Sequence, residues 1–411
     1  MQIEEARERT ARLLTELVRC PSVNPGRGES LAPPFGEARL QEMVAARLSA
    51  LGARVTWGDA LPGRRNLIAT FAGRDAGRSL MLEAHADTVG VEGMSIAPFD
   101  AVIEGGKLHG RGACDTKGSM AAMLTAVEEV IGREGKPGVT LHVVLTCNEE
   151  HGGDGAHALM RSGFRADAAI SGEPTGLEIV NVHKGAIRWD VETHGVAAHS
   201  STPHRGVNAI SMMARVIAEL DAKVIPALAE RTHPQLGAPT MSVGTIRGGT
   251  QVNVIPARCR IEIDRRVIPG ETREEATAEV TRALEGLARA DERFKWSMTQ
   301  TEWYAPLEES EGSPVAVALA AACRRVTGRA AFACAPWATD GGIFKQYGLP
   351  SVVFGPGVIA QAHTKDEYVE LEQVAVAAMV YEEAIREFES QAREQCKVQS
   401  EKWSVNGGKF Q

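Results

Sequence analysis

Up to about residue 180, short apolar runs alternate with stretches in which apolar side chains recur at helical spacing. Three runs are rich in apolar and β-branched residues and predict buried strands: residues 66–71, 79–84 and 139–147. Residues 117–131 carry apolar side chains every three or four positions, which predicts a helix. This alternation of strands and helices is typical of an α/β fold with a mostly parallel sheet.

The pattern changes after about residue 184. Residues 186–194 alternate apolar and polar side chains, which is typical of a strand with one face in water. The elements that follow are a helix over 206–221, strands over 240–246 and 257–267, a helix over 272–289 and a strand over 294–301. The order βαββαβ predicts a ferredoxin-like α+β unit.

The α/β pattern returns after Pro306, with a helix predicted over 313–326, a strand over 351–354 and a helix from 371 to about 386. We therefore predict one α/β domain formed by residues 1–183 and 307–390, with the ferredoxin-like unit inserted at 184–306. Residues 391–411 are polar and contain glycine, and we expect this tail to be partly disordered.

Composition narrows the class of protein. The chain has 411 residues, of which 44% are hydrophobic and 24% are charged, values normal for a soluble globular protein of two or three domains. A net charge of −8 argues against a nucleic-acid-binding surface, which requires clustered Lys and Arg. No apolar run approaches the length of a membrane-spanning helix, so we expect no membrane partner.

The start of the chain and the cysteines indicate a cytoplasmic protein. Residues 1–18 mix Glu with Arg and lack the apolar core of a signal peptide. They predict an amphipathic helix with Leu13, Leu14, Leu17 and Val18 on one side. The 7 cysteines are scattered, with no CxxC pair, so a disulfide framework is not expected.

Acidic residues and histidines gather where the predicted strands end. The residues concerned are His85, Asp87, Asp115, Glu149, Glu150, Glu173 and His363. Open α/β sheets bind ligands at the carboxyl ends of their strands, so we expect these side chains near one another. His85 and Asp87 are two positions apart in extended chain and therefore point to the same side.

Each of these residues also has a purely structural interpretation. A histidine after a strand is often only a hydrogen-bonded structural group, and Asp115, which precedes a helix, could be an N-cap. Paired glutamates such as Glu149 and Glu150 are usually solvated, although here they follow a strongly apolar strand. The recurrence of such residues at successive strand ends favours a shared site.

Imidazole and carboxylate side chains are ligands of zinc, and catalytic zinc sites keep one position open. Two zinc ions bridged by a carboxylate polarise a carbonyl group and generate a nucleophilic hydroxide. Three ligand carboxylates and one hydroxide offset two divalent cations, which leaves a further carboxylate for proton transfer. Residues of these types are thus suited to hold two zinc ions, for which cobalt or manganese could substitute.

The sequence resembles the zinc-dependent superfamily of acetylornithine deacetylases, succinyl-diaminopimelate desuccinylases, glutamate carboxypeptidases and aminoacylases. The matching stretches are LEAHADTV, GGKLHGRGACDTKGSMAAML, TCNEEHGG, ISGEP, GVAAHSSTPHRGVNAI, NVIPARCRIEIDRRVIPGE and FGPGVIAQAHTKDEYV. They extend from about residue 65 to 375, in the order of the family. The resemblance implies a catalytic α/β domain and an inserted lid through which the chain forms a homodimer.

The resemblance also implies two sets of metal ligands that share a bridging carboxylate. One zinc ion would be bound by His85, Asp115 and Glu173, and the other by Asp115, Glu150 and His363. Asp87 would hydrogen-bond to His85 and fix its orientation. Glu149 would be the general base that takes a proton from water and returns it to the leaving amine.

Positions in the predicted lid match residues that contact substrate in the superfamily. His199, in the sequence AAHSS, would stabilise the oxyanion, either within its own chain or across a dimer. Asn253, in the sequence NVIP, would also contact the substrate.

Arg266 matches a further substrate-contacting position, and an arginine suits a substrate carboxylate because it can grip it bidentately. Arg265 is adjacent, so either arginine could be the contact, or both could be solvated strand residues. Thr339 and Gly341, in ATDGG, resemble a substrate loop of the superfamily with lower specificity.

We therefore expect an enzyme that hydrolyses an amide bond in a small substrate that carries a carboxylate. The resemblance favours N-deacylation of an N-acyl amino acid. A carboxypeptidase or dipeptidase would use the same residues, so both alternatives stay open. Outside the enzyme class, the alternative is a non-catalytic relative that binds a small molecule through the same cleft.

Overall fold

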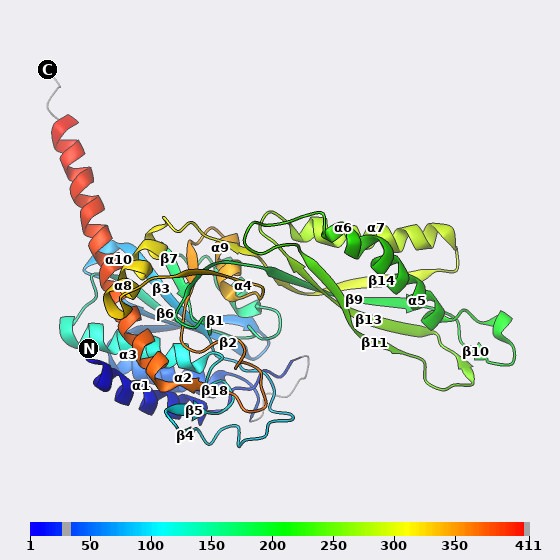
Figure 1. Ribbon diagram of the computed structural model, residues 1–411, viewed down its shortest axis with the longest axis horizontal. Helices are drawn as coiled ribbons and strands as arrows, with labels where there is room; N and C mark the ends of the chain where they lie inside the picture. The colour runs from blue at the N-terminus through cyan, green and yellow to red at the C-terminus, as the bar shows by residue number, and fades with distance from the viewer. Residues whose placement is uncertain (27–33, 407–411) are drawn as a thin grey trace. The chain divides into compact units, whose positions relative to one another are not determined.

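The computed structural model describes residues 1–26 and 34–406, apart from the side chains of residue 76 and residues 392–406. The chain forms two compact units. Unit 1 comprises Met1–Asn181, Glu309–Ala333 and Thr339–Gln411, and unit 2 comprises Val182–Glu308 and Cys334–Ala338 (Figure 1). Each unit has its own cluster of buried hydrophobic side chains.

Unit 1 is built on a mixed sheet whose middle strands are parallel. The strands lie in the order β1 (Arg54–Leu61), β2 (Arg64–Phe71), β6 (Val139–Thr146), β3 (Asp75–His85), β7 (Ala168–Ser171), β17 (Ser351–Val353) and β8 (Ile179–His183). The short strands β15 (Leu307–Glu308) and β16 (Phe332–Ala335) both pair with β8. Strands β6, β3, β7 and β17 run parallel to one another, which confirms the predicted α/β fold.

Helices and one small sheet complete unit 1. The helices are α1 (Ile3–Val18), α2 (Ala38–Ala50), α3 (Lys117–Glu134), α4 (Asp154–Arg161), α8 (Pro314–Thr327), α9 (Asp340–Gln346) and α10 (Leu371–Asn406). The small sheet has the order β18 (Tyr368–Glu370), β5 (Lys107–His109) and β4 (Val102–Glu104). As predicted, α1 is amphipathic and buries Leu13, Leu14, Leu17 and Val18.

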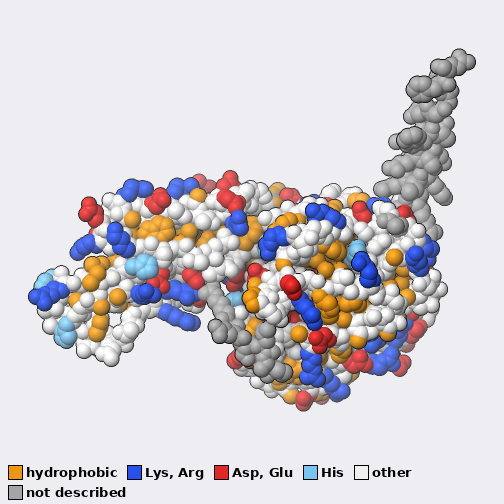
Figure 2. Space-filling model, turned by 180° about the vertical axis from the view of Figure 1, so that it is seen from behind, with side chains coloured by type: hydrophobic (Ala, Val, Ile, Leu, Met, Phe, Trp, Pro, Cys, Tyr) orange, Lys and Arg blue, Asp and Glu red, His pale blue; other side chains and the backbone are white. Residues whose placement is uncertain are grey.

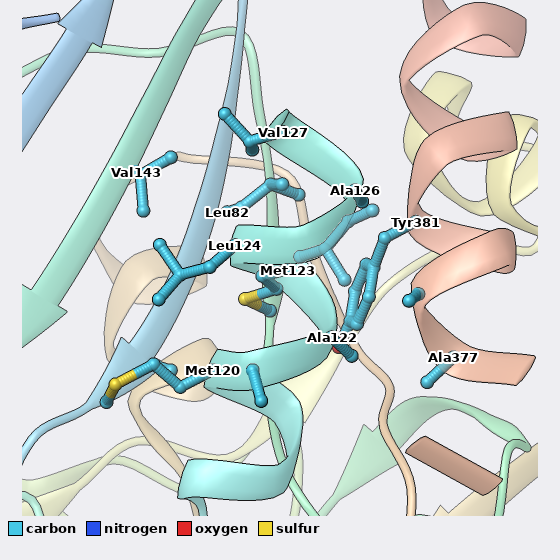
Figure 3. Packing of buried hydrophobic residues seen from close by; sticks show 14 of the residues in the cluster. Leu82, Met120, Ala122, Met123, Leu124, Ala126, Val127, Val143, Ala377 and Tyr381 are labelled. Atoms are coloured by element: carbon cyan, nitrogen blue, oxygen red, sulfur yellow. The ribbon is translucent and has the colours of Figure 1, made fainter. Parts of the chain in front are cut away.

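Helix α3 is the most deeply buried helix of unit 1. Leu124 points toward Val143 of β6, whereas Ala126 on the other side of the helix lies toward Tyr381 of α10 (Figure 3). The helix ends where Gly135 adopts a left-handed φ of 66°, a conformation that glycine adopts without a steric penalty. Packing on both sides fixes the start of α3, and with it the loop that carries Asp115.

Unit 2 contains an antiparallel sheet of order β11 (Thr240–Gly248), β13 (Arg258–Val267), β9 (Gly185–His194) and β14 (Lys295–Tyr304). Helix α5 (Ala209–Glu219) connects β9 toward β11, and α7 (Arg273–Ala290) connects β13 to β14. This is the predicted ferredoxin-like arrangement. The remaining elements are β10 (Ala198–His199), η1 (Pro203–Arg205), η2 (Leu220–Val224), α6 (Ile225–Leu228) and β12 (Val254–Ile255).

The core of unit 2 follows from the alternation of residues in β9. Ile187, Trp189 and Val191 are buried, as the two-residue period predicts. Helix α7 begins with a capping box in which the Thr272 hydroxyl accepts the Glu275 N–H and the Glu275 carboxylate accepts the Thr272 N–H. The alternation in β9 therefore explains which of its side chains enter the core of unit 2, and the capping box explains where α7 begins.

The last helix differs from the prediction. The sequence pattern predicts an end near Arg386, but α10 continues to Asn406. No glycine or proline interrupts residues 387–406, so nothing in the local sequence stops the helix there. The expected disordered tail therefore continues α10 as far as residue 406, and residues 407–411 lie outside the described part of the chain.

Helix character and surface charge bear on the partners that the chain could have. Among the described residues, no helix combines the length and apolar character needed to cross a membrane. Acidic and basic side chains are interspersed on the face seen in Figure 2, so this face carries no single sign of charge.

The packing of α3 predicts the effect of a core substitution. Leu124 is fully buried, so Leu124→Ala should lower the free energy of unfolding by about 2–5 kcal/mol, because the loss of buried methyl groups leaves a cavity. Urea denaturation measured by circular dichroism tests this value. The matched control is Val317→Ala, since Val317 lies on α8 but is exposed, and it should change stability by no more than about 0.5 kcal/mol.

Candidate metal centre

The four parallel strands of unit 1 end at one edge of the sheet, and a predicted site residue follows each of them. His85 is the last residue of β3, Glu149 follows β6, Glu173 follows β7, and His363 lies in the loop after β17. Asp115 comes from the loop before α3. Parallel strands of adjacent position bring residues far apart in sequence to one place.

Short distances join these side chains. His85 Nε2 lies 2.9 Å from Asp115 Oδ1 and 3.8 Å from Glu173 Oε1. His363 Nε2 lies 3.2 Å from Asp115 Oδ2 and 3.1 Å from Glu150 Oε2. The two oxygens of Asp115 thus face two different histidines.

The ligand atoms form two groups, His85–Asp115–Glu173 and Asp115–Glu150–His363, within each of which all atoms lie within 4.8 Å of one another. These are the two sets that the sequence resemblance implies. The interpretation of Asp115 as a helix N-cap is wrong, because Thr116 is the N-cap residue of α3 and the Asp115 carboxylate faces the histidines.

Electrostatics test whether these residues fit bound cations. Burial raises the pKa of Glu173 well above its usual range, and the neighbouring Asp115 raises it further. Burial also raises the pKa of Glu149 well above its usual range, and the carboxylate of Glu173 acts in the same upward direction. Carboxylates crowded into a buried site repel one another, and divalent cations remove this repulsion. The donor set of imidazole and carboxylate groups therefore fits a pair of divalent cations.

The histidines take part in the same balance of charge. Hydrogen bonds to Asp115 and Glu150 raise the pKa of His363 to about 11. Burial alone would raise the pKa of Asp115, but hydrogen bonds from His363 and His85 hold it below its usual range. A cation must displace the proton from each imidazole nitrogen that it binds, so cation binding and protonation compete at these residues.

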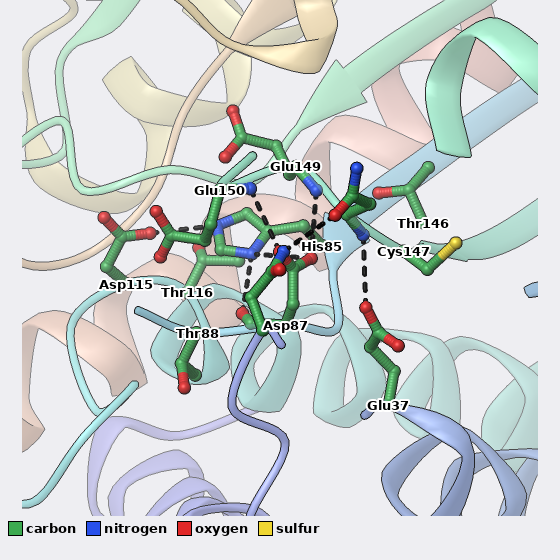
Figure 4. A network of polar contacts seen from close by, with 12 residues as sticks. Glu37, His85, Asp87, Thr88, Asp115, Thr116, Thr146, Cys147, Glu149 and Glu150 are labelled. Carbon is green, nitrogen blue, oxygen red and sulfur yellow. Dashed lines mark hydrogen bonds and ion pairs between the residues drawn. The ribbon is translucent and has the colours of Figure 1, made fainter. Parts of the chain in front are cut away.

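Asp87 has a different contact from the one expected. Its main-chain oxygen lies 2.9 Å from His85 Nδ1, while its carboxylate is 3.8 Å away (Figure 4). The carboxylate instead accepts the main-chain N–H groups of Glu149 and Glu150, each at 3.0 Å, and the Asn24 side-chain amide at 2.6 Å. Asp87 therefore orients His85 through its backbone and fixes the two glutamates through its side chain.

A buried ion pair supports the same turn, and sequence reasoning missed it. Arg64 Nε donates to both oxygens of Glu37 at 3.1 Å, and Arg64 Nη1 donates to Asn148 Oδ1 at 2.7 Å. The Asn148 N–H donates to Glu37 at 3.2 Å. Asn148 directly precedes Glu149, but its partners are 84 and 111 residues away, so no local motif reveals this support.

The sequence profile described as "Peptidase family M20/M25/M40" matches residues 81–387, which include every residue of the two ligand groups. This chain belongs to peptidase family M20/M25/M40.

Solved structures of similar fold agree with this assignment. A tripeptidase from Staphylococcus aureus is 23% identical, with a TM-score of 0.75 over 93% of this chain and 99% of that one. Human carnosine dipeptidase 1 is 18% identical, with a TM-score of 0.76 over 94% and 98%. A dinuclear metal-binding peptidase of family M20 from Bacillus subtilis is 16% identical, with a TM-score of 0.67 over 93% and 98%. At these identities the likeness shows a shared fold.

Two predicted substrate-contacting residues of this M20 chain, His199 and Asn253, lie close together in unit 2. His199 of β10 pairs with Val254 of β12, and the Asn253 main-chain oxygen accepts the Ser200 N–H at 3.0 Å. His199 and Asn253 are both exposed, and His199 Nδ1 lies 2.7 Å from the Ser201 hydroxyl. The two-stranded sheet thus contains His199, and Asn253 directly precedes its second strand.

The two adjacent arginines of this M20 chain lie on opposite sides of β13. Arg265 is fully buried and donates to Glu271 at 2.6 Å. Arg266 is partly exposed and donates to Asp264 at 2.8 Å. Residues in a strand alternate between its faces, so only one of the two can face solvent. The structure leaves Arg266 as the arginine available to a ligand.

The remaining predicted contacts are buried. Thr339 is the N-cap residue of α9, and its hydroxyl accepts the Gly341 N–H at 3.1 Å. Gly341 packs against Val353 and Ser171, where an added Cβ would lie 3.0 Å from a Val353 methyl. These contacts give both residues a structural role, and their contact with substrate stays a prediction.

Proposed function

We propose that this chain hydrolyses an amide bond at a centre of two zinc ions, and that it removes the acyl group from an N-acyl amino acid. The observation that carries the proposal is the convergence of two ligand groups on the two oxygens of Asp115. Membership of peptidase family M20/M25/M40 supports metal-dependent amide hydrolysis. Imidazole with carboxylate ligands suits zinc, and cobalt or manganese can take its place.

A second candidate is the hydrolysis of a short peptide, as a dipeptidase or carboxypeptidase. The names of two of the similar structures support it, since they are a carnosine dipeptidase and a tripeptidase. Both reactions break the same kind of bond and need the same groups. They differ in whether the group on the carbonyl side of that bond is an acyl group or an amino acid.

The residues of the centre would have separate roles in metal binding and in positioning. His85, Asp115 and Glu173 would hold one cation, and Asp115, Glu150 and His363 the other. Such cations polarise a carbonyl and lower the pKa of water, which makes water a nucleophile at neutral pH. Asp87 holds the turn of Glu149 and Glu150 beside His85, because its carboxylate accepts the two main-chain N–H groups of that turn and its main-chain oxygen lies 2.9 Å from His85 Nδ1.

Glu149 would move the proton. It is buried, it belongs to neither ligand group, and its main chain is held beside Glu150 by Asp87. In this position its carboxylate takes a proton from water during attack on the carbonyl carbon. The same proton then passes to the amine nitrogen as the amide bond breaks.

Substrate recognition would come from unit 2. Arg266 is partly exposed on β13 and can exchange its contact with Asp264 for a substrate carboxylate. His199 on β10 and Asn253, which directly precedes β12, are both exposed and close together, so they can act on one substrate together. We assign to His199 the hydrogen bond to the developing oxyanion.

We further propose that the protein is a cytoplasmic homodimer formed through unit 2. Strand β11 stands at the end of the sheet, and an edge strand offers N–H and C=O groups for pairing with another chain. Ile246 on this strand is 55% exposed, and Ile210 on α5 is 41% exposed. A two-fold axis would bury these apolar side chains against their copies.

Metal analysis and a substrate panel test the proposed function. We expect about two zinc ions per chain, loss of activity on chelation, and recovery with zinc, cobalt or manganese. N-acyl amino acids should be cleaved faster than dipeptides or tripeptides. Faster cleavage of the peptides would favour the second candidate, and full activity in protein stripped of transition metals would exclude both.

Replacing Glu149 tests the proton transfer. Glu149→Gln should lower kcat by at least about 10²-fold, the scale of general acid–base catalysis, with two zinc ions still bound. Glu311→Gln is the matched control, because Glu311 is exposed in unit 1, and it should keep full activity. Normal turnover in the Glu149→Gln variant would refute the assignment.

The role of His199 is tested by a substitution and by hybrid dimers. His199→Ala should lower kcat by about 10²-fold or more with little change in zinc content, the effect of losing one oxyanion donor. His204→Ala, which alters a nearby exposed histidine, should have no such effect.

Mixing inactive His199→Ala chains with inactive Glu149→Gln chains shows which subunit supplies the histidine. Partial recovery indicates that it acts across the dimer, and no recovery after proven subunit exchange indicates that it acts within its own chain. Sedimentation as a monomer at every concentration would remove the homodimer from the proposal.

A further inference from the structure

A buried glutamate outside both ligand groups holds the loop that carries Asp115. The side chain of Glu367 is 1% exposed, and its carboxylate is 2.7 Å from Arg111 Nη1, which donates to Oε2. Main-chain N–H groups of Gly112, Cys114 and Asp115 donate to the same carboxylate at 2.9, 2.9 and 3.1 Å. Each of its two oxygens accepts two hydrogen bonds, so the carboxylate is fully occupied.

Glu367 is also part of the segment that carries His363. It lies four residues after His363 and directly before β18, which pairs with β5. Its main-chain oxygen accepts the Gly110 N–H at 3.0 Å, and the Lys365 main-chain oxygen accepts the Ser95 N–H at 2.8 Å. The carboxylate and the main-chain oxygen of Glu367 therefore both bind residues 110–115, the stretch of chain that ends in Asp115.

The two ligand groups depend on this contact to different degrees. In the group Asp115–Glu150–His363, two of the three ligands belong to segments that Glu367 joins. In the group His85–Asp115–Glu173, Asp115 is the only such ligand. The side chain of His363 is 49% exposed, so packing restrains it less than it restrains the buried His85.

We propose that Glu367 is a positioning residue that sets the distance between Asp115 and His363. The affinity of the group Asp115–Glu150–His363 for its cation, the second cation, then depends on Glu367. The inference rests on the proposed pair of cations. Residues that orient metal ligands typically change metal affinity by about 10- to 100-fold when they are replaced. Loss of Glu367 should therefore weaken one site of the centre and spare the other.

Titration of metal-free protein with Co²⁺ tests the proposal. Glu367→Gln replaces one carboxylate oxygen by an amide NH₂, which cannot accept the hydrogen bonds of the two groups that face it. We expect the first equivalent of Co²⁺ to bind within about threefold of the wild-type affinity, and the second to bind at least about 10-fold more weakly. Visible absorption and equilibrium dialysis count the bound ions without reference to activity.

A matched control separates positioning from the general loss of a buried carboxylate. Glu309 is also buried, and its carboxylate accepts hydrogen bonds from the main-chain N–H groups of Ser310 and Ser351. It also forms an ion pair with Lys345. Ser351 is the first residue of β17, at the amino end of that strand and away from the ligands. Glu309→Gln should therefore lower stability but leave both Co²⁺ affinities unchanged.

The possible outcomes distinguish this inference from the proposed function. Binding of fewer than two ions by the wild-type protein would overturn both. Two ions in the wild type, with unchanged or equally weakened affinities in Glu367→Gln, would overturn the positioning role alone. If Glu367→Gln does not fold, Arg111→Gln serves instead, since it removes the guanidinium group that donates to the Glu367 carboxylate. Wild-type affinity for the second ion in that variant would overturn the inference.

Discussion

The structure of unit 1 is organised around the repulsion between buried carboxylates. Asp115, Glu149, Glu150 and Glu173 meet at one edge of the sheet, and burial raises the pKa of Glu149, Glu150 and Glu173. Such a group is unfavourable unless positive charge is supplied to it. The two imidazoles supply part of that charge, and the geometry of the remaining oxygens suits divalent cations. The chemistry of the site follows from this requirement.

The scaffold keeps those groups together despite their repulsion. Four parallel strands set the spacing of the ligands, and α3, buried on both sides, fixes the loop of Asp115. Around the ligands, charged groups are satisfied in pairs or networks, as at Glu37 with Arg64 and at Glu367 with Arg111. These surrounding contacts therefore hold the ligand side chains in place although the carboxylates repel one another.

Much of this arrangement could be predicted from the sequence, because it depends on local patterns. The period of apolar residues revealed the parallel strands and the ferredoxin-like unit, and the strand ends revealed the residues that the structure brings together. Contacts between distant segments could not be predicted. The Asp87 side chain binds the turn of Glu149 and Glu150 rather than His85, and Arg64 reaches Asn148 across 84 residues. The end of α10 was missed because polar composition suggests disorder, although no helix-breaking residue is present before Gly407.

The two oxygens of Asp115 make the two halves of the centre thermodynamically linked. A cation bound between His85 and Glu173 would fix the plane of this carboxylate and thereby orient its second oxygen toward His363. By reciprocity, a cation at the second position would favour occupancy of the first to the same degree. The shared carboxylate thus couples the two sites in favour of joint occupancy, whereas the repulsion between two neighbouring dications opposes it, and the two stepwise affinities report the balance between these effects.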